Sequence, residues 1–359
     1  MRRTYKKLFE KMIFFENLFL ATRKAQKGKK MKKDTAQFNL NMERELLKLQ
    51  KELKNQTYIP GAYRYFYVYD PKKRLISAAP YRDRVVHHAF CRIVEPIFDK
   101  MFIYDSYACR IAKGTHIALD RAQKFLRANK YILQCDIAKY FLSIDHGVLL
   151  AILGRRIKDD RVMRLAKKII TGHSTGFPIG NLTSQFFANL YLNELDYFIK
   201  FGLRKKHYIR YMDDFLVFGN DKRRLHEIKD EVKCFLENKL GLDLHPKKNT
   251  IFPVRIGIGF LGFRIFKEYR QLTKENIRLF LTRMRKFRSL FIQGLMSMPE
   301  ISRSLRCWLA HAAYGNTRAL SANLTALFFN RAIFSVRVLY EARTSICHDR
   351  RRAHNVIYC

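Results

Sequence analysis

Two adjacent carboxylates, Asp213 and Asp214, interrupt an otherwise apolar run, and they constrain the fold more than any other feature. The segments on either side, residues 208–212 and 215–218, have the aromatic and β-branched composition of strands. This pattern predicts a hairpin with both acids at its tip. A second apolar run, YILQCDI over residues 131–137, carries Asp136 near its end and has the composition of a buried strand.

Carboxylates placed among apolar neighbours at strand ends repel one another, and the pKa of each rises unless a cation joins them. Magnesium accepts a small number of carboxylates together with substrate phosphates. Two such ions support in-line phosphoryl chemistry by activating a hydroxyl and steadying the leaving group. A buried aspartate that caps a turn is the alternative interpretation of any one acid. It does not explain Asp136, Asp213 and Asp214 together, so the sequence predicts a centre with two magnesium ions.

Positive charge dominates the composition. The 359 residues include 70 Lys and Arg against 31 Asp and Glu, which gives a formal net charge of +39. This excess indicates a polyanionic partner, for which nucleic acid is the usual case and an anionic membrane surface the competing one. The sequence has no stretch of about 18 uncharged apolar residues that would span a membrane. Its seven scattered cysteines lack CxxC spacing, which favours a reduced, cytoplasmic protein.

Periodicity and breaker residues divide the chain into helices and short strands. Residues 1–57 are basic and helical in pattern, and strands over residues 63–69 and 74–78 form a predicted basic hairpin. Further helices are expected over residues 82–98, 115–128, 146–170, 183–200 and 222–239, and from residue 276 onward. Strands crossed by helices and followed by a helical appendage indicate an α+β catalytic domain with a helical lobe.

Six segments resemble the motifs of reverse transcriptases and occur in the order of that family. They are RLISAAPYRDRVVHHA at residues 74–89, DIAKYFLSIDH at 136–146, GFPIGNLTSQFFANLYLNELD at 176–196, YMDD at 211–214, HPKK at 245–248 and FLGF at 260–263. The resemblance covers roughly residues 35–330 and implies a right-hand polymerase. Its parts would be an N-terminal extension over residues 1–57, fingers and palm over 58–270, a helical thumb over 271–335 and a basic tail over 336–359.

The same resemblance implies a reaction, the RNA-templated addition of deoxynucleotides to a 3′-hydroxyl, and assigns roles to residues. Two magnesium ions would be held by Asp136, Asp213 and Asp214 with the main-chain carbonyl of Ile137. Phe141 would exclude a 2′-hydroxyl from the nucleotide site. Lys247 and Lys248 are equal candidates for the general acid that protonates pyrophosphate. The other nucleotide-binding residues that the resemblance implies are Arg74, Lys72, Arg84, Lys139, Tyr140, Ile179, Gly180 and Gln185.

Contacts with nucleic acid are implied for a further set, Tyr211, Met212, Gly262, Arg283 and Lys286. The last two lie in NIRLFLTRMRKFRSLF, residues 276–291, which combines an apolar stripe with a basic face. Such a face can follow the shape of an RNA–DNA duplex without reading its base sequence. The implied partners are template RNA, the primer or cDNA strand, and deoxynucleoside triphosphates.

One motif resembles a particular branch of the family. IGNLTSQ, residues 179–185, is similar to the corresponding segment in reverse transcriptases of diversity-generating retroelements. Those enzymes copy RNA with frequent errors opposite adenine, and they act with a small, basic, oligomeric accessory variability protein. Ile179 offers no hydrogen bond beside a new base pair, and a site without polar contacts discriminates poorly. We therefore expect an error-prone enzyme encoded by a bacterium or a phage.

Two alternatives stay open from the sequence. A bacterial anti-phage defence reverse transcriptase, with unusual priming, has the same style of motif, and the flanking genes would separate it from a retroelement. A non-catalytic RNA-binding scaffold would also explain the positive charge. Against the scaffold, a protein without catalysis has no need to keep three like charges together. A primer-extension assay with magnesium would test it.

Overall fold

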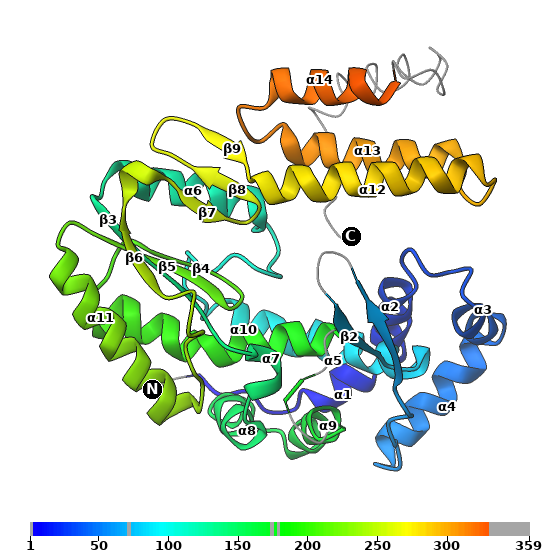
Figure 1. Cartoon of the computed structure of the whole chain (residues 1–359). Coiled ribbons are helices and arrows are strands. Elements are labelled where there is room, and N and C mark those ends of the chain that lie inside the picture. Colours follow the sequence, from blue (N-terminus) through cyan, green and yellow to red (C-terminus); the bar gives the residue numbers. More distant parts are fainter. Residues whose placement is uncertain (1–2, 70–72, 173–175, 178–179, 330–359) are drawn as a thin grey trace. The chain divides into compact units, whose positions relative to one another are not determined.

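The computed structural model describes residues 3–69, 73–172, 176–177 and 180–329 (Figure 1). The chain divides into two compact units, Met1–Pro253 and Val254–Cys359. Helices are mixed with antiparallel strands in both units, which confirms the predicted α+β class. All three acids singled out by the sequence lie in the first unit.

Four helices open the first unit, and they precede a longer fifth helix. They are α1 Phe9–Ile13, α2 Phe15–Ala25, α3 Lys33–Leu40, α4 Met42–Lys54 and α5 Tyr81–Asp99. On α4 the buried residues Leu46, Leu49 and Leu53 recur at helical spacing, so one stripe faces the core and the charged residues face solvent. The amino end of α1 is held by Asp159, whose carboxylate accepts from the main-chain N–H of Leu8 at 2.8 Å.

The predicted basic hairpin is present as a two-stranded antiparallel sheet of β1 Arg64–Val68 and β2 Arg74–Ala78. Every residue of β1 is exposed, including Tyr65, Phe66 and Tyr67. A strand in a globular domain usually buries one of its faces. This hairpin therefore presents an aromatic surface to solvent.

The centre of the first unit is a four-stranded antiparallel sheet with the order β4-β5-β3-β6. Its strands are β3 Tyr131–Asp136, β4 Tyr208–Tyr211, β5 Asp214–Gly219 and β6 Thr250–Pro253. Four consecutive residues of β5 are buried, because both faces of the sheet are covered. On one face Phe218 meets Phe125 of α6 (Thr115–Arg127), with ring centroids 5.6 Å apart. The alternate residues Phe215 and Val217 join the main core of the unit.

The remaining helices described in the first unit are α7 Tyr140–Ser143, α8 His146–Gly154, α9 Asp160–Ile170, α10 Leu182–Tyr197 and α11 Lys222–Phe235. Helices α10 and α11 each continue into a π-helical turn, Phe198–Gly202 and Leu236–Leu240. The rings of Phe198 and Phe235 stack there with centroids 4.2 Å apart. Helix α10 is buried along most of its length, and its polar residues Asn189 and Asp196 are buried with it.

The second unit combines a three-stranded antiparallel sheet with helices. Its strands are β7 Ile258–Phe260, β8 Phe263–Ile265 and β9 Arg270–Leu272, and its helices are α12 Lys274–Ile292, α13 Met298–Ala312 and α14 Arg318–Phe329. Helices α12 and α13 meet where Phe280 stacks on Trp308, with ring centroids 3.8 Å apart. The Trp308 indole N–H also donates to Asn276 Oδ1 at 3.0 Å. A capping box of Ser297 and Glu300 begins α13.

Within the described residues, which end at residue 329, the helices and strands expected from the sequence are present, with one interruption. Residues 146–170 were expected to form one helix, but they form α8 and α9. Asp159 separates the two, because its carboxylate caps α9 by accepting from the main-chain N–H of Val162 at 3.3 Å. In the part of the chain that the structure describes, every helix is too short or too polar to cross a membrane.

Candidate active site

The central sheet brings the three acids together. Strands β3 and β5 are antiparallel neighbours, and their register places Asp136 opposite Asp214. Strands β4 and β5 form the predicted hairpin, in which Tyr211 pairs with Asp214. Met212 and Asp213 therefore make the two-residue turn, one residue earlier than predicted. Asp214 is not part of the tip but the first residue of β5, because it pairs with Tyr211. Main-chain pairing thus sets where Asp136 and Asp214 lie relative to each other.

Burial and mutual repulsion make two of these carboxyls weaker acids. Burial, reinforced by the negative charge of Asp136, raises the pKa of Asp214 to about 7. The same two causes, burial first, raise the pKa of Asp213 above its ordinary value. Asp214 Oδ1 is buried and has no hydrogen-bond partner among the residues that the structure describes. A buried carboxylate oxygen without a donor, beside a second carboxylate, has the chemistry of a cation ligand.

Lys248 supplies the positive charge that Asp136 faces. Its ammonium pairs with Asp136 Oδ2, and its charge also lowers the pKa of Asp214. The segment that carries Lys248 is attached to the end of β3 through the main chain of Asp136. The main-chain carbonyl of Asp136 accepts from the N–H of His245 at 2.7 Å, and the main-chain N–H of Asp136 donates to Asn249 Oδ1 at 3.3 Å. The HPKK segment is therefore part of the site.

The donor set fits magnesium. Within the described part of the chain, no three His, Cys, Asp or Glu residues are grouped as a complete metal site. Magnesium does not require such a cage, because it keeps water ligands and takes one or two carboxylates together with substrate phosphates. Asp136, Asp213 and Asp214 are hard oxygen donors of this kind. Ile137, the fourth predicted ligand, is buried and pairs with Leu244 in an isolated antiparallel bridge.

Two residues beside the acids have a left-handed backbone. Lys139 has φ 45° and ψ 35°, and Met212 has φ 57°. This conformation costs a residue other than glycine about 1–2 kcal/mol, so the surroundings must hold it in place. Lys139 directly precedes α7, and Met212 opens the turn that carries Asp213. Both strained residues therefore set the path of the main chain at the acids.

Tyr140 and Phe141 have different surroundings. Tyr140 is buried, and its hydroxyl donates to a main-chain carbonyl of α10 at 2.5 Å, so its side chain is a core contact. Phe141 is half-buried, and its carbonyl accepts from the N–H of Phe177 at 2.6 Å. Gly176 is required next to this contact, because its φ is +55° and a Cβ there would lie 2.4 Å from the Leu142 carbonyl oxygen. The motif segments 136–146 and 176–196 are therefore in direct contact.

The segment before α10 approaches the β1–β2 hairpin closely. Gly180 has φ +119°, and a Cβ at this position would lie 2.9 Å from Ile76 Cγ2 on β2. Gln185 is half-buried in the first turn of α10. Two other predicted nucleotide-binding residues, Ile179 and Lys72, lie outside the described residues.

The two predicted arginines of the first unit lie in different places. Arg74 is exposed at the start of β2, and its charge lowers the pKa of Asp213, which places it within electrostatic reach of the acids. Arg84 of α5 instead pairs with Asp34 of α3 at 2.9 Å and covers the ring of Tyr81. The structure therefore associates Arg84 with the N-terminal helices and not with the acids.

Three predicted nucleic-acid-binding residues belong to the second unit. Gly262, with φ +85°, follows Leu261, with φ +51°, in the two-residue turn between β7 and β8. Positive φ at both positions is typical of a type I′ hairpin, where glycine is favoured, so the turn explains Gly262 without a ligand. Arg283 is half-buried on α12 and Lys286 is exposed there. In the first unit, the Tyr211 hydroxyl shares a hydrogen bond with Thr115 Oγ1 at 3.2 Å.

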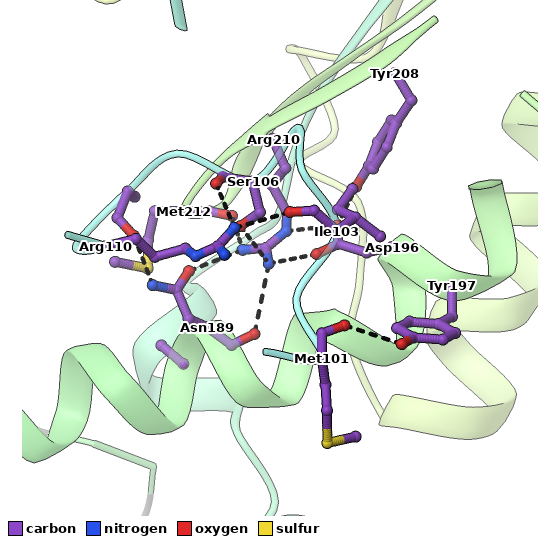
Figure 2. Close-up of polar contacts among 12 residues, drawn as sticks. Met101, Ile103, Ser106, Arg110, Asn189, Asp196, Tyr197, Tyr208, Arg210 and Met212 are labelled. Carbon is purple, nitrogen blue, oxygen red and sulfur yellow. Dashed lines mark hydrogen bonds and ion pairs between the residues drawn. The ribbon is translucent and has the colours of Figure 1, made fainter. Parts of the chain in front are cut away.

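One polar group at the site was not predicted from the sequence. Arg210 of β4 is fully buried, and its guanidinium forms a bidentate pair with Asp196 of α10 at 2.7 and 2.6 Å (Figure 2). The Tyr208 hydroxyl also donates to Asp196, at 2.7 Å. The sequence offered two signals for this buried pair. One is an arginine in the apolar run before the paired acids, and the other is an aspartate near the end of an apolar helix. Each alone resembles an ordinary surface charge.

The raised pKa of Asp214 predicts how stability depends on pH when no metal is bound. Between 3.8, the ordinary value, and about 7, the folded state holds a proton that the unfolded state has lost. Stability therefore falls as the pH rises through this window. We expect this group to lower the free energy of unfolding by on the order of 2 kcal/mol between pH 5 and pH 8.

Urea unfolding of the wild type and of Asp214→Asn, each with and without Mg²⁺, measures this effect. The substitution should flatten the dependence on pH, and Mg²⁺ should restore the stability of the wild type at pH 8. The same slope in both proteins would contradict the prediction.

Comparison with known proteins gives the family. A family model described as reverse transcriptase (RNA-dependent DNA polymerase) matches residues 69–265. Protein YkfC of Escherichia coli (strain K12) is 28% identical over 62% of this chain and 72% of that protein. The group II intron-encoded protein LtrA of Lactococcus lactis subsp. cremoris is 25% identical over 62% of this chain and 50% of LtrA. A solved structure of apo telomerase from Candida tropicalis has 12% identity and a TM-score of 0.47, covering 60% of this chain and 48% of that one.

The matched segment contains the whole candidate site. The chain spans about half the length of LtrA and of the telomerase chain. The family match nevertheless covers more than half of the 359 residues and includes the three acids, Lys248 and all six motif segments. On the match and on the arrangement of the acids in the central sheet, the chain belongs to the reverse transcriptase family.

Proposed function

We propose that this chain is an RNA-directed DNA polymerase, which extends a 3′-hydroxyl with deoxynucleotides on an RNA template. The observation that carries the proposal is the pairing of Asp136 with Asp214 across two strands, beside the turn that holds Asp213. Family membership supplies the class of reaction. The strand pairing supplies the ligands that this chain would use for it.

In this proposal Asp136, Asp213 and Asp214, with the main-chain carbonyl of Ile137, hold two magnesium ions. When bound, these ions supply the charge that activates the 3′-hydroxyl and neutralises the leaving pyrophosphate. The contribution of the chain itself is orientation, because the β3–β5 ladder fixes two of the carboxylates before any substrate arrives. Asp214, whose pKa is raised, gives up its proton as a cation binds, so binding is coupled to proton release.

The cationic side chains around the acids would receive the nucleotide. Lys248 is better placed than Lys247 to act as general acid, because its ammonium already pairs with Asp136. When a triphosphate binds, Lys248 would exchange its ion pair with Asp136 for one with the triphosphate, and it could then protonate the leaving pyrophosphate. Arg74 offers a planar guanidinium that suits phosphate oxygens. The main-chain amides near Lys139 and Tyr140 and the close approach of Gly180 to β2 would complete the nucleotide site.

The template would lie on surfaces that combine aromatic rings with positive charge. On the β1–β2 hairpin, exposed Tyr65 and Tyr67 alternate with Phe66, and Lys73 lies over the Tyr67 ring, 4.4 Å from its centroid. Rings that stack bases beside cations that pair with phosphates are the usual surface for a single strand. In the first unit, Tyr211 and Met212 would contact nucleic acid. In the second unit, Arg283 and Lys286 of α12 are separate candidates for such a contact.

The test is extension of a DNA primer on an RNA template by the full chain in Mg²⁺, followed by sequencing of the product. A cDNA complementary to the RNA is expected. The absence of product on several primer–templates, or a product whose sequence ignores the template, would refute the proposed function.

We further propose that the enzyme is the error-prone reverse transcriptase of a diversity-generating retroelement, acting with a small basic accessory variability protein. The support is the segment IGNLTSQ, in which the side chain of Ile179 has no hydrogen-bonding group. Without a polar contact from the protein to the new base pair, a correct pair gains no hydrogen bond that an incorrect pair would lack. The enzyme then discriminates poorly between them.

Replacing Ile179 by glutamine should therefore lower misincorporation opposite template adenine by about tenfold. Ile179→Leu is the matched control, because it keeps the apolar character and the volume of the side chain. Errors would be counted by sequencing cDNA made on one defined RNA. Equal error rates in the wild type and Ile179→Gln would exclude this role for Ile179.

A further inference from the structure

Arg210 joins the turn that carries Asp213 to helix α10 (Figure 2). Its Nε and one Nη2 N–H bind Asp196. Its Nη1 donates to Asn189 Oδ1 and to the main-chain carbonyl of Met212, both at 3.1 Å, and Nη2 also donates to Ser106 Oγ at 3.1 Å. The five N–H groups of the guanidinium are thus all engaged. One of them holds the main chain of the turn itself.

Net stability does not explain a charged group at this position. A buried ion pair often contributes no more than well-packed apolar side chains of similar volume, because both charges lose their hydration. The Arg210–Asp196 ion pair instead holds the guanidinium in one defined orientation. Met212 needs such support, because its φ of 57° is strained for a residue with a side chain. Strained backbone persists where its surroundings fix it.

The guanidinium can fix the turn because Arg210 is itself held from two sides. Its main-chain N–H donates to the carbonyl of Asp105 at 2.9 Å, and its carbonyl accepts from the N–H of Tyr107 at 3.0 Å. Asn189, which orients Nη1, donates through Nδ2 to the Ala108 carbonyl at 2.7 Å. The segment before α6 and helix α10 therefore clamp Arg210 between them.

We propose that Arg210 is a positioning residue, which sets the Asp213 carboxylate by holding the carbonyl of Met212. The inference rests on the proposed function for its catalytic consequence. Its structural part, the ordering of the turn, does not depend on catalysis. The two parts can therefore be tested separately.

The discriminating variant is Arg210→Lys. Lysine keeps a positive charge for Asp196, but it lacks the planar fork that reaches Met212 at the same time. We expect the maximal rate of nucleotide addition to fall by about 10–100-fold, as it does when residues that orient ligands are lost. The KM for nucleotide and the affinity for primer–template should stay close to those of the wild type. Amide hydrogen exchange of the peptide spanning residues 211–214 should become faster.

Tyr208→Phe is the matched control. It removes a hydrogen bond from Asp196 in the same buried network but leaves the contact between Arg210 and Met212 in place. Exchange at residues 211–214 and the maximal rate should stay near the wild-type values, even if the unfolding midpoint falls. If Arg210→Lys does not fold, Asn189→Ala replaces it. That variant removes the Oδ1 acceptor that orients Nη1, the same nitrogen that donates to the Met212 carbonyl, whereas Tyr208→Phe removes no partner of Nη1.

The outcomes for Arg210→Lys, Asn189→Ala and Tyr208→Phe distinguish the proposal from a purely structural role of Arg210. Faster exchange and a lower maximal rate in Arg210→Lys or Asn189→Ala, with neither change in Tyr208→Phe, support the proposal. Unchanged exchange in the folded variant, or equal losses in Tyr208→Phe, overturn it. If the wild type itself shows no RNA-templated extension while the exchange still responds to Arg210→Lys, the proposed function fails and the positioning of the turn stands.

Discussion

Asp213→Asn is expected to reduce RNA-templated extension by about 10³-fold or more, the scale seen when a group that stabilises transition-state charge is removed. Asparagine has nearly the shape of aspartate, so the turn between β4 and β5 should form as before. It carries no charge, so the site loses one of the three anionic oxygen donors that would hold the cations. Binding of primer–template should stay close to wild type or tighten, because a chain with a net charge of +39 loses one negative charge.

Asp221→Asn provides the control for Asp213→Asn. Asp221 is an exposed aspartate that caps α11 just beyond β5, where its carboxylate accepts from the N–H of Arg223 at 2.8 Å. Its substitution makes the same chemical change outside the proposed metal site, and extension should stay near the wild-type rate. Single-turnover extension and fluorescence anisotropy of labelled primer–template measure the two effects. If Asp213→Asn still extends within tenfold of Asp221→Asn, Asp213 is not a catalytic ligand.

Phe141→Ala is expected to admit ribonucleotides, raising their incorporation relative to deoxynucleotides by about 10–100-fold. Phe141 is half-buried in α7, five positions after Asp136 in the chain, and its main-chain carbonyl accepts a hydrogen bond from the N–H of Phe177. In the proposed role, the ring would reject a 2′-hydroxyl by steric clash, and truncation would remove this discrimination. Incorporation of deoxynucleotides should change less, because a deoxynucleotide has no 2′-hydroxyl to clash with the Phe141 ring.

Leu142→Ala is the matched control for Phe141→Ala, because Leu142 is the next residue and its side chain is 60% exposed. Its truncation should leave sugar selectivity unchanged. The ratio of kcat/KM for ribonucleotide and deoxynucleotide addition, measured on one primer–template, gives the answer. Selectivity in Phe141→Ala equal to that of Leu142→Ala would show that Phe141 is a packing residue.

Local patterns in the sequence predicted the hairpin that carries Asp213 and Asp214, although they placed its turn one residue too late. The apolar runs around Asp213 and Asp214 specify two strands, and two residues between strands specify a tight turn. The run that ends near Asp136 is apolar at successive positions, as a strand covered on both faces must be. Their pairing in the structure follows from a shared need to bury these faces in one sheet. The α+β class was predictable for the same reason.

Contacts between distant polar residues were not predictable from local patterns. Arg210 and Asp196 look like unrelated charges until β4 lies on α10, because neither residue interrupts the periodicity of its own segment. Arg84 was assigned to the nucleotide by its place in a motif, but its partner is Asp34, in a helix that no motif includes. Asp159 lies inside the span 146–170 that the pattern predicts to be helical, but its carboxylate caps α9 and holds the start of α1.

The most direct test of the proposed metal centre is iron-mediated cleavage of the chain. Fe²⁺ replaces Mg²⁺, and added hydrogen peroxide with ascorbate generates hydroxyl radicals at the bound iron that cut the main chain beside it. We expect cuts near residues 136–138 and 212–214 in the wild type. Excess Mg²⁺ should suppress them, and Asp136→Asn should remove them. Cleavage confined to other parts of the chain, or an unchanged pattern in Asp136→Asn, would contradict the assignment of these three acids to one metal centre.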